Sequence, residues 1–249
     1  MERSEFDKLD SAEDRMWWFA GLHRNLSMLL RRLPLQAVNL AIMDAGCGTG
    51  GLLAHLAQAY PDKTVLGLEL DPWACRRASL KSARPVCAGS VNELPFADAV
   101  FNAIFSADVL CHEGVDEHSA LRQFHRCLAE RGWLILNLPA YPWMLSGHDA
   151  AVCNVRRYTV SGLSKLLRAV GFQPIYMSYW NAILFPLMVM TRKLPWRQHG
   201  NVSDVRVYPR PVERLCHGVT RVETALLRSG LRFPFGGSLL AIAQKGRHR

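Results

Sequence analysis

Three common features are missing from this sequence of 249 residues. No two of its seven cysteines form a C-x-x-C pair, which excludes the usual spacing of a zinc site and gives no disulfide framework. The amino terminus carries no apolar core of a secretory signal, and no apolar run is long enough to span a bilayer. Together these absences predict a protein of the reducing cytoplasm that holds no metal.

Acidic residues are scarce relative to basic ones. The chain has 30 Lys and Arg against 21 Asp and Glu, a formal net charge of +9, while 49% of its residues are hydrophobic, enough for a buried core. Most of the surplus lies between Arg192 and Arg232, where nine basic residues face three acidic ones. Such a surplus favours nucleic acid, anionic lipid or an anionic substrate as partner.

Short apolar runs alternate with helical segments from Leu40 onward. We expect strands at residues 40–45, 64–70, 85–88, 100–106, 133–138, 172–180 and 238–244. The helices expected between them cover residues 51–60, 72–83, 117–129 and 159–170, the last capped by Gly171. This order predicts an α/β fold with a Rossmann-like, seven-stranded, mainly parallel sheet flanked by helices.

A single domain is expected to fill the chain. Its parts are a helical cap (1–39), a core (40–180), an insertion (181–235) and a last strand with a basic tail (236–249). Within the cap, helical spacing of apolar residues predicts one helix over residues 13–33, ended by Pro34. The aromatic residues 17–19 either pack on the core or form a lid over a cleft, and packing is favoured.

The strongest local signal is the segment 42–51, in which a strand meets glycines and then a helix. Gly46, Gly48 and Gly51 match the dinucleotide pattern G-x-G-x-x-G. Asp44 argues against that function, because a carboxylate there would repel a pyrophosphate and attract a cationic sulfonium nucleoside.

Motifs in register over residues 40–138 resemble those of the class I methyltransferases, specifically the type 11 group. Asp44 and the glycines match the first motif, Glu69 matches the acid that ends the second strand, and residues 89–96 resemble G-D-x-x-x-L-P-F with Ser90 in place of the acid. The resemblance implies S-adenosylmethionine as cofactor, with S-adenosylhomocysteine as product. The cofactor-binding residues that it implies are Asp44, Gly46, Cys47, Gly48, Gly50, Glu69, Leu70, Ser90, Val91, Ser106 and Asp108.

Methyl transfer to a hydroxyl or protonated amine calls for a base near the ends of the fourth and fifth strands. His148, in an H-D motif followed by R-R-Y-T, is the first candidate, with Tyr158 to orient it; His112 is the second. Asp149 either orients His148 or pairs with an arginine. The residues expected to bind substrate are Tyr141, Arg156, Arg157 and Trp180, one arginine holding the loop and the other an anionic group.

The apolar segment 182–190, followed by basic residues, allows four interpretations: a roof over an acceptor pocket, a peripheral membrane contact through residues 182–197, a homodimer patch, or core. Pocket roof and core are favoured. The leading functional hypothesis is O- or N-methylation of a small apolar or aromatic acceptor. A nucleic-acid methyltransferase is disfavoured because no [DNS]-P-P-[YFW] motif follows the fourth strand, and a noncatalytic partner with this fold is the third hypothesis.

Overall fold

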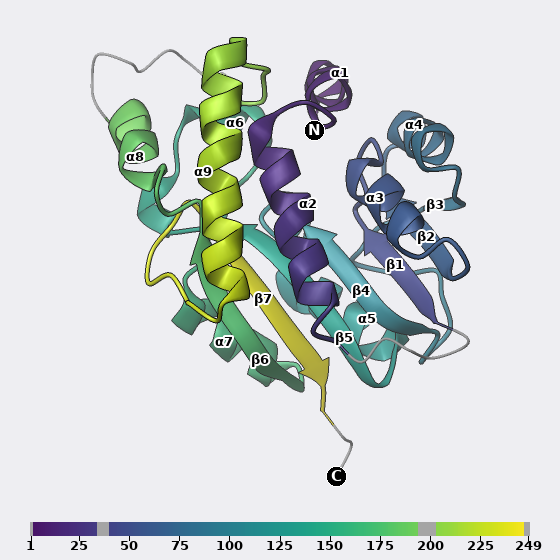
Figure 1. The fold of residues 1–249 in the computed structure, drawn as a ribbon. Helices are drawn as coiled ribbons and strands as arrows, with labels where there is room; N and C mark the ends of the chain where they lie inside the picture. The colour runs from purple at the N-terminus through teal and green to yellow at the C-terminus, as the bar shows by residue number, and fades with distance from the viewer. Residues whose placement is uncertain (1, 34–39, 194–202, 247–249) are drawn as a thin grey trace.

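A seven-stranded sheet organises the computed structural model, which describes residues 2–33, 40–193 and 203–246 (Figure 1). The strand order is β3-β2-β1-β4-β5-β7-β6. The strands are β1 (Ala41–Ala45), β2 (Thr64–Glu69), β3 (Val86–Ala88), β4 (Phe101–Ala107), β5 (Leu128–Pro139), β6 (Phe172–Trp180) and β7 (Ser238–Lys245). Only β7 runs antiparallel to its neighbours, which confirms the predicted Rossmann-like, mainly parallel architecture.

Helices cover both faces of the sheet. On one face α2 (Trp17–Leu30) and α9 (Arg210–Arg228) pack side by side, while α5 (Glu117–Cys127) and α7 (Val160–Ala169) lie on the other (Figure 1). The helices α3 (Gly51–Ala59) and α4 (Pro72–Ser82) flank the β1–β3 end of the sheet. Because the sheet is covered on both faces, β1 is apolar except for Asp44: Ile42 enters one core and Met43 the other.

The chain order reverses between β1 and β4, which are neighbours in the sheet although β2 and β3 separate them in sequence. Crevices at such a reversal, beyond the carboxyl ends of the strands, are where open α/β sheets bind ligands. The short helices η1 (Pro142–Met144) and α6 (Gly147–Ala151) follow β5 at this edge. The fold therefore places the glycine loop and the H-D motif at the same edge of the sheet.

The single helix expected over residues 13–33 is wrong. The structure has α1 (Arg3–Ala12) and α2, separated by residues 13–16. Two carboxylates explain the break: the Trp17 N–H donates to Glu213 at 2.8 Å, which satisfies the first turn of α2, and the Glu13 side chain turns toward the glycine loop. Trp18 stacks on Trp180 with ring centroids 5.6 Å apart, so this aromatic ring packs on the core as favoured.

The segment 181–235 contains two helices that the sequence analysis did not predict, α8 (Phe185–Lys193) and α9. The expected boundaries elsewhere agree within a few residues, except that β5 starts at Leu128. Gly171 has φ +93°, the left-handed conformation expected after α7. Within the described residues, no helix combines the length and apolarity needed to cross a bilayer.

Candidate active site

The glycine loop follows β1 directly, and its conformation requires glycine. Gly46, Gly48 and Gly50 have φ values of +79°, +54° and +96°. A Cβ on Gly46 would lie 2.4 Å from Cγ2 of Val109, and one on Gly50 would lie 2.6 Å from the Ala78 backbone. The loop can therefore pack tightly between α4 and the end of β4 only because it carries no side chains there.

Asp44, the last but one residue of β1, is the most unusual group at this edge. It is 1% exposed, and its Oδ2 has no hydrogen-bond partner among the described residues. Burial raises its pKa to about 8, and the nearby carboxylates of Glu13 and Glu69 contribute to the same rise. A buried carboxyl group without a partner is costly, and a ligand that brings a cation or donor to Oδ2 would remove that cost.

Glu69 is held by the backbone of its own neighbourhood. Its Oε2 accepts from the Gly48 N–H at 2.9 Å, while Oε1 accepts from the N–H groups of Leu70 and Asp71. A carboxylate offers four acceptor positions, so one on Oε2 stays available to a ligand hydroxyl. Leu70 is 69% exposed beside it, as a residue facing an open cleft would be.

The remaining residues of the implied cofactor set line the same edge. Cys47 is buried, and burial raises the pKa of its thiol. Ser90 is half-buried and Val91 buried, in the turn that follows β3. Ser106 is buried at the end of β4, with no partner for its hydroxyl among the described residues. At this edge, two buried polar side-chain atoms, one on Asp44 and one on Ser106, thus have no hydrogen-bond partner among the described residues.

Asp108 begins a chain of hydrogen bonds that the sequence analysis missed. It has φ +55°, and its Oδ2 accepts from Asn137 Nδ2 at 3.0 Å, while Asn137 Oδ1 accepts from Trp180 Nε1 at 2.8 Å. Burial raises the pKa of Asp108 to about 7. Trp180 is fully buried and its one donor is engaged, so it supports the site from beneath and does not contact an acceptor as expected.

Glu13 is a second residue of the site that the sequence analysis missed. Its carboxylate accepts from the Thr49 hydroxyl at 2.7 Å and from the Gly51 N–H at 3.1 Å, and it pairs with Lys81 of α4. It thereby satisfies the first turn of α3 from outside the helix. Leu9 lies over Gly48, where an added Cβ would come within 3.2 Å, so α1 covers the glycine loop. No local pattern around Glu13 signals this role.

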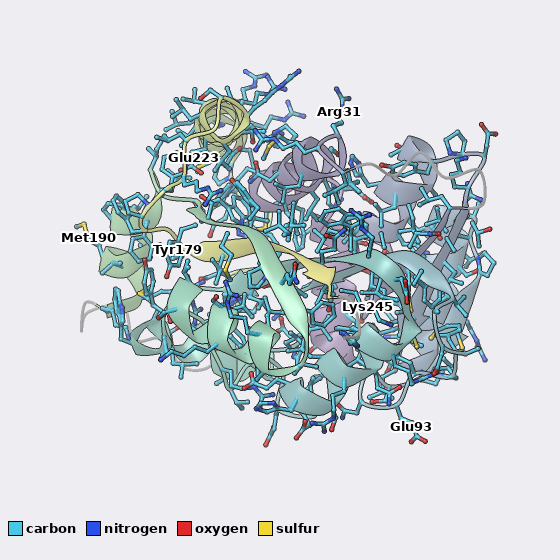
Figure 2. All side chains as sticks on the ribbon, turned by 90° about the horizontal axis from the view of Figure 1, so that it is seen from below. Arg31, Glu93, Tyr179, Met190, Glu223 and Lys245 are labelled. Carbon is cyan, nitrogen blue, oxygen red and sulfur yellow. The ribbon has the colours of Figure 1, made fainter. Side chains whose placement is uncertain are left out.

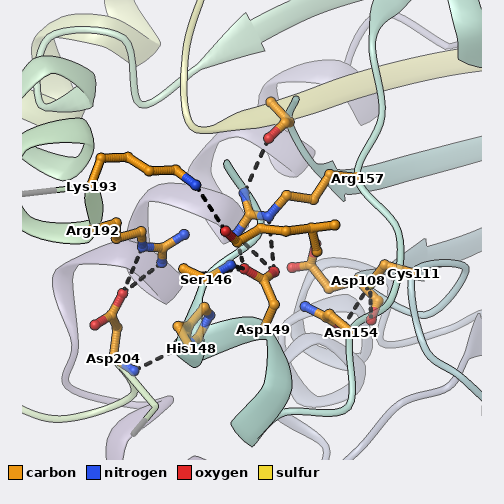
Figure 3. Close-up of polar contacts among 12 residues, drawn as sticks. Asp108, Cys111, Ser146, His148, Asp149, Asn154, Arg157, Arg192, Lys193 and Asp204 are labelled. Atoms are coloured by element: carbon orange, nitrogen blue, oxygen red, sulfur yellow. Dashed lines mark hydrogen bonds and ion pairs between the residues drawn. The ribbon is translucent and has the colours of Figure 1, made fainter. Parts of the chain in front are cut away.

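His148 lies in the short helix α6 that follows β5 and η1 (Figure 3). Its Nδ1 accepts from the Asp204 N–H at 3.0 Å, so the neutral ring must carry its proton on Nε2. Burial lowers its pKa to about 4, with a further contribution from Arg192. The Nε2 atom of the neutral ring is therefore a donor in this arrangement, and the role of His148 as a base stays a prediction.

Asp149 takes the second of its two expected roles, pairing with an arginine. It binds Arg157 through two bonds of 2.9 and 3.0 Å, and both side chains are almost fully buried (Figure 3). Its Oδ2 also accepts from the backbone N–H and hydroxyl of Ser146, which closes a capping box on α6. Asp149 therefore fixes the loop that carries His148 and does not touch the ring.

Arg156, Tyr158 and His112 also hold this loop to the end of β4. Arg156 donates to the carbonyls of Leu110, His112 and Val115. The Tyr158 hydroxyl contacts Leu110 O at 2.8 Å and Glu117 Oε2 at 2.7 Å, so Tyr158 does not orient His148 as expected. His112 is half-buried, and burial lowers its pKa. Both arginines of the R-R-Y-T run thus have structural partners in this arrangement.

Tyr141, directly after β5, belongs to an aromatic group. Its ring stacks on Tyr179 with centroids 4.9 Å apart, and Trp143 and Phe185 lie within 6 Å of it. Phe235 contacts Phe185 in turn. Trp143 and Phe235 are about half exposed, at 53% and 46%. An apolar or aromatic ligand would find ring surfaces at this position.

Comparisons with known proteins agree with this geometry. A family model described as a methyltransferase domain matches residues 43–136. A malonyl-[acyl-carrier protein] O-methyltransferase of Herminiimonas arsenicoxydans is 30% identical over 118 residues, 47% of this chain and 44% of its own length. Methyltransferase str2 of Strobilurus tenacellus is 30% identical over 181 residues, 73% of this chain and 62% of its own length. The chain therefore spans about half the length of these curated relatives.

Solved structures also resemble this chain in their fold. A chain in the complex of the Haloferax volcanii Trm112 methyltransferase activator has a TM-score of 0.62 and 18% identity, over 99% of this chain and 98% of its own length. This is a Rossmann-like methyltransferase fold. Its defining features are the order of the strands, the glycine loop after β1, and the carboxylates of Asp44 and Glu69 at the carboxyl ends of β1 and β2. Residues 43–136 match the methyltransferase domain family, and this match supports a class I S-adenosylmethionine-dependent methyltransferase.

Proposed function

We propose that this protein binds S-adenosylmethionine at the carboxyl ends of β1 and β2 and methylates an oxygen atom of a small apolar or aromatic acceptor. The observation that carries the proposal is the unpartnered, buried Asp44 carboxyl group beside the glycine loop. Asp44 and Glu69 make the site acidic, which suits a cofactor that carries a sulfonium and an amino group and opposes a pyrophosphate. The O-methyltransferase names among the relatives support oxygen as the methylated atom.

The residues fit the cofactor in three places. Glu69 keeps one acceptor position for a ribose hydroxyl, the loop at Gly46 lets a ligand approach the backbone, and Ser106 and Asp108 lie at the end of the neighbouring strand. When bound, the cofactor supplies an electrophilic methyl group. The protein then has to align the acceptor, exclude water and, for a hydroxyl acceptor, take up a proton.

The acceptor side is formed by α6 and the aromatic group around Tyr141. The ring surfaces of Tyr141 and Trp143 would hold an apolar acceptor, and the Nε2 proton of His148 would donate a hydrogen bond to a polar atom of the acceptor. Arg156 and Arg157, which the sequence suggested as substrate ligands, would act by fixing this loop.

Calorimetric titration tests the cofactor site. We expect S-adenosylmethionine and S-adenosylhomocysteine to bind the parent protein and to bind at least about tenfold more weakly to Asp44→Ala and Glu69→Ala. Asp62→Ala is the matched control, because Asp62 is exposed and outside the site. Absence of binding to folded parent protein would contradict the proposal. Binding without turnover across an acceptor panel would instead favour the noncatalytic hypothesis.

A further inference from the structure

The helix α9 buries its polar side and exposes its aliphatic side. Three polar residues of α9, Glu213, Thr220 and Glu223, are buried beside Cys216 and Leu227. All three have defined partners, because Glu213 accepts from the Trp17 N–H and Thr220 accepts from the Arg24 guanidinium. Glu223 accepts from the backbone N–H groups of residues 181 and 183. A solvent-facing helix normally has the opposite pattern, with its apolar residues facing the core.

Aliphatic side chains form a stripe along the outer side of α9. Val212, Leu215, Val222 and Leu226 are 41%, 67%, 54% and 38% exposed. Their spacing of three, seven and four residues places them along one line on the helix. Because α9 has 19 residues, the stripe follows a helix of about 28 Å. An apolar line of this length, facing away from the protein core, indicates a surface that contacts another apolar phase.

Exposed apolar side chains also occur in α8 and just before it. Ile183 is 49% exposed, and its N–H donates to Glu223, in the last third of α9, at 2.6 Å. Leu187 and Met190 on α8 are 58% and 55% exposed, and Figure 2 shows Met190 projecting outward from the edge of the molecule. In Figure 1, α8 and α9 lie on the same side of the sheet edge, away from α3 and α4.

The helix α9 also carries arginines that are exposed to solvent. Arg210, Arg214, Arg221 and Arg228 are exposed on α9, and none forms an ion pair with another described residue. They belong to the stretch between residues 192 and 232 in which nine basic residues face three acidic ones. The three acids there are committed within the protein, Asp204 to Arg192 and the two glutamates to backbone N–H groups.

We propose that the outer side of α9, with the exposed side chains of Ile183, Leu187 and Met190, binds peripherally to a membrane that contains anionic lipids. Aliphatic side chains would enter the boundary between headgroups and acyl chains, and the α9 arginines would contact the phosphates. A second copy of the chain fits less well, because an α9–α9 contact would bring unpaired arginines of both copies together. This inference is independent of the proposed methyl transfer.

Vesicle co-sedimentation of the full chain tests the surface. We expect binding to vesicles of phosphatidylcholine with phosphatidylglycerol, weaker binding to phosphatidylcholine alone, and loss of binding at high salt. Leu215→Ser/Leu226→Ser should weaken partitioning at least about tenfold, since each buried leucine contributes roughly that factor. Arg214→Gln/Arg221→Gln should weaken binding to the anionic vesicles alone.

Two control variants separate the surface from general properties of the protein. Leu80→Ser removes a leucine that is 78% exposed on α4, and Arg168→Gln removes an exposed arginine on α7; both should bind like the parent. Equal binding by the parent and the double leucine variant would overturn the proposal. So would a concentration-dependent dimer, detected by light scattering, that the leucine changes disperse while no variant binds vesicles.

Discussion

Asp44→Asn should change how the stability of the protein depends on pH. The carboxyl group is buried beneath the glycine loop with a pKa of about 8, against about 4 in an unfolded chain. Between these values the folded state keeps a proton that the unfolded state releases. Folding is therefore progressively penalised as the pH rises from about 4 to about 8, and asparagine, which has no proton to lose, escapes the penalty.

The magnitude follows from the shift. Each pH unit within the window costs the parent about 1.4 kcal/mol relative to the variant. Between pH 5 and pH 7 the difference in the free energy of unfolding should therefore change by about 2.7 kcal/mol in favour of Asp44→Asn. Burial is the largest cause of the shift, so the effect should persist at high salt, where the contributions of Glu13 and Glu69 are screened.

Urea unfolding of the parent and of Asp44→Asn, without cofactor, at pH 5, 6 and 7 measures this difference. Asp108, whose pKa is about 7, titrates in the same direction but is common to both proteins and cancels. Parallel stability curves over this range would refute the reasoning, because they would mean that Asp44 is ionised in the folded protein with a partner that neutralises it.

Three further results are expected. Asp149→Ala should lower the free energy of unfolding by about 3–5 kcal/mol in urea titrations, because it leaves the buried Arg157 charge unpaired; a loss below about 1 kcal/mol would show that the pair is solvated. Gly50→Ala should destabilise the protein by at least about 1 kcal/mol, whereas Gly114→Ala, where an added Cβ meets no atom within 4 Å, should not; equal melting temperatures would contradict the assigned backbone. Binding of S-adenosylmethionine at pH 7 should release up to about one proton from Asp44, seen as a buffer-dependent calorimetric heat; buffer-independent heats would exclude that linkage.

The strands could be predicted from the sequence because both faces of the sheet are covered. In the run 100–106, Phe101 and Ile104 enter one core and Ala103 and Phe105 the other, so the apolar signal of this strand is local. The glycine loop is equally local: the positive φ values of Gly46, Gly48 and Gly50 are conformations that glycine adopts without strain. At these positions the local sequence pattern predicts the same conformation that the folded protein adopts.

The parts that could not be predicted depend on partners far along the chain. Glu13 stops a helix whose apolar spacing continues, because its carboxylate is used by residues 49, 51 and 81. Trp180 carries an aromatic side chain that suits substrate binding, yet Asn137 of β5 engages its only donor within the core. The apolar spacing in α9 is helical, but that helix could not be placed from a core-facing pattern because its aliphatic residues face outward.

The distribution of charge at the carboxyl edge favours a neutral acceptor. The cofactor side, at β1 and β2, carries the acids Asp44 and Glu69. Near His148, Arg157 pairs with Asp149 and Arg192 with Asp204, while Lys193 donates to the Leu145 carbonyl and has no carboxylate partner among the described residues (Figure 3). An anionic acceptor that paired with Arg157 would leave the buried Asp149 carboxylate unpaired, which costs several kcal/mol. A neutral acceptor would use the aromatic surfaces around Tyr141 and would leave both ion pairs as they are.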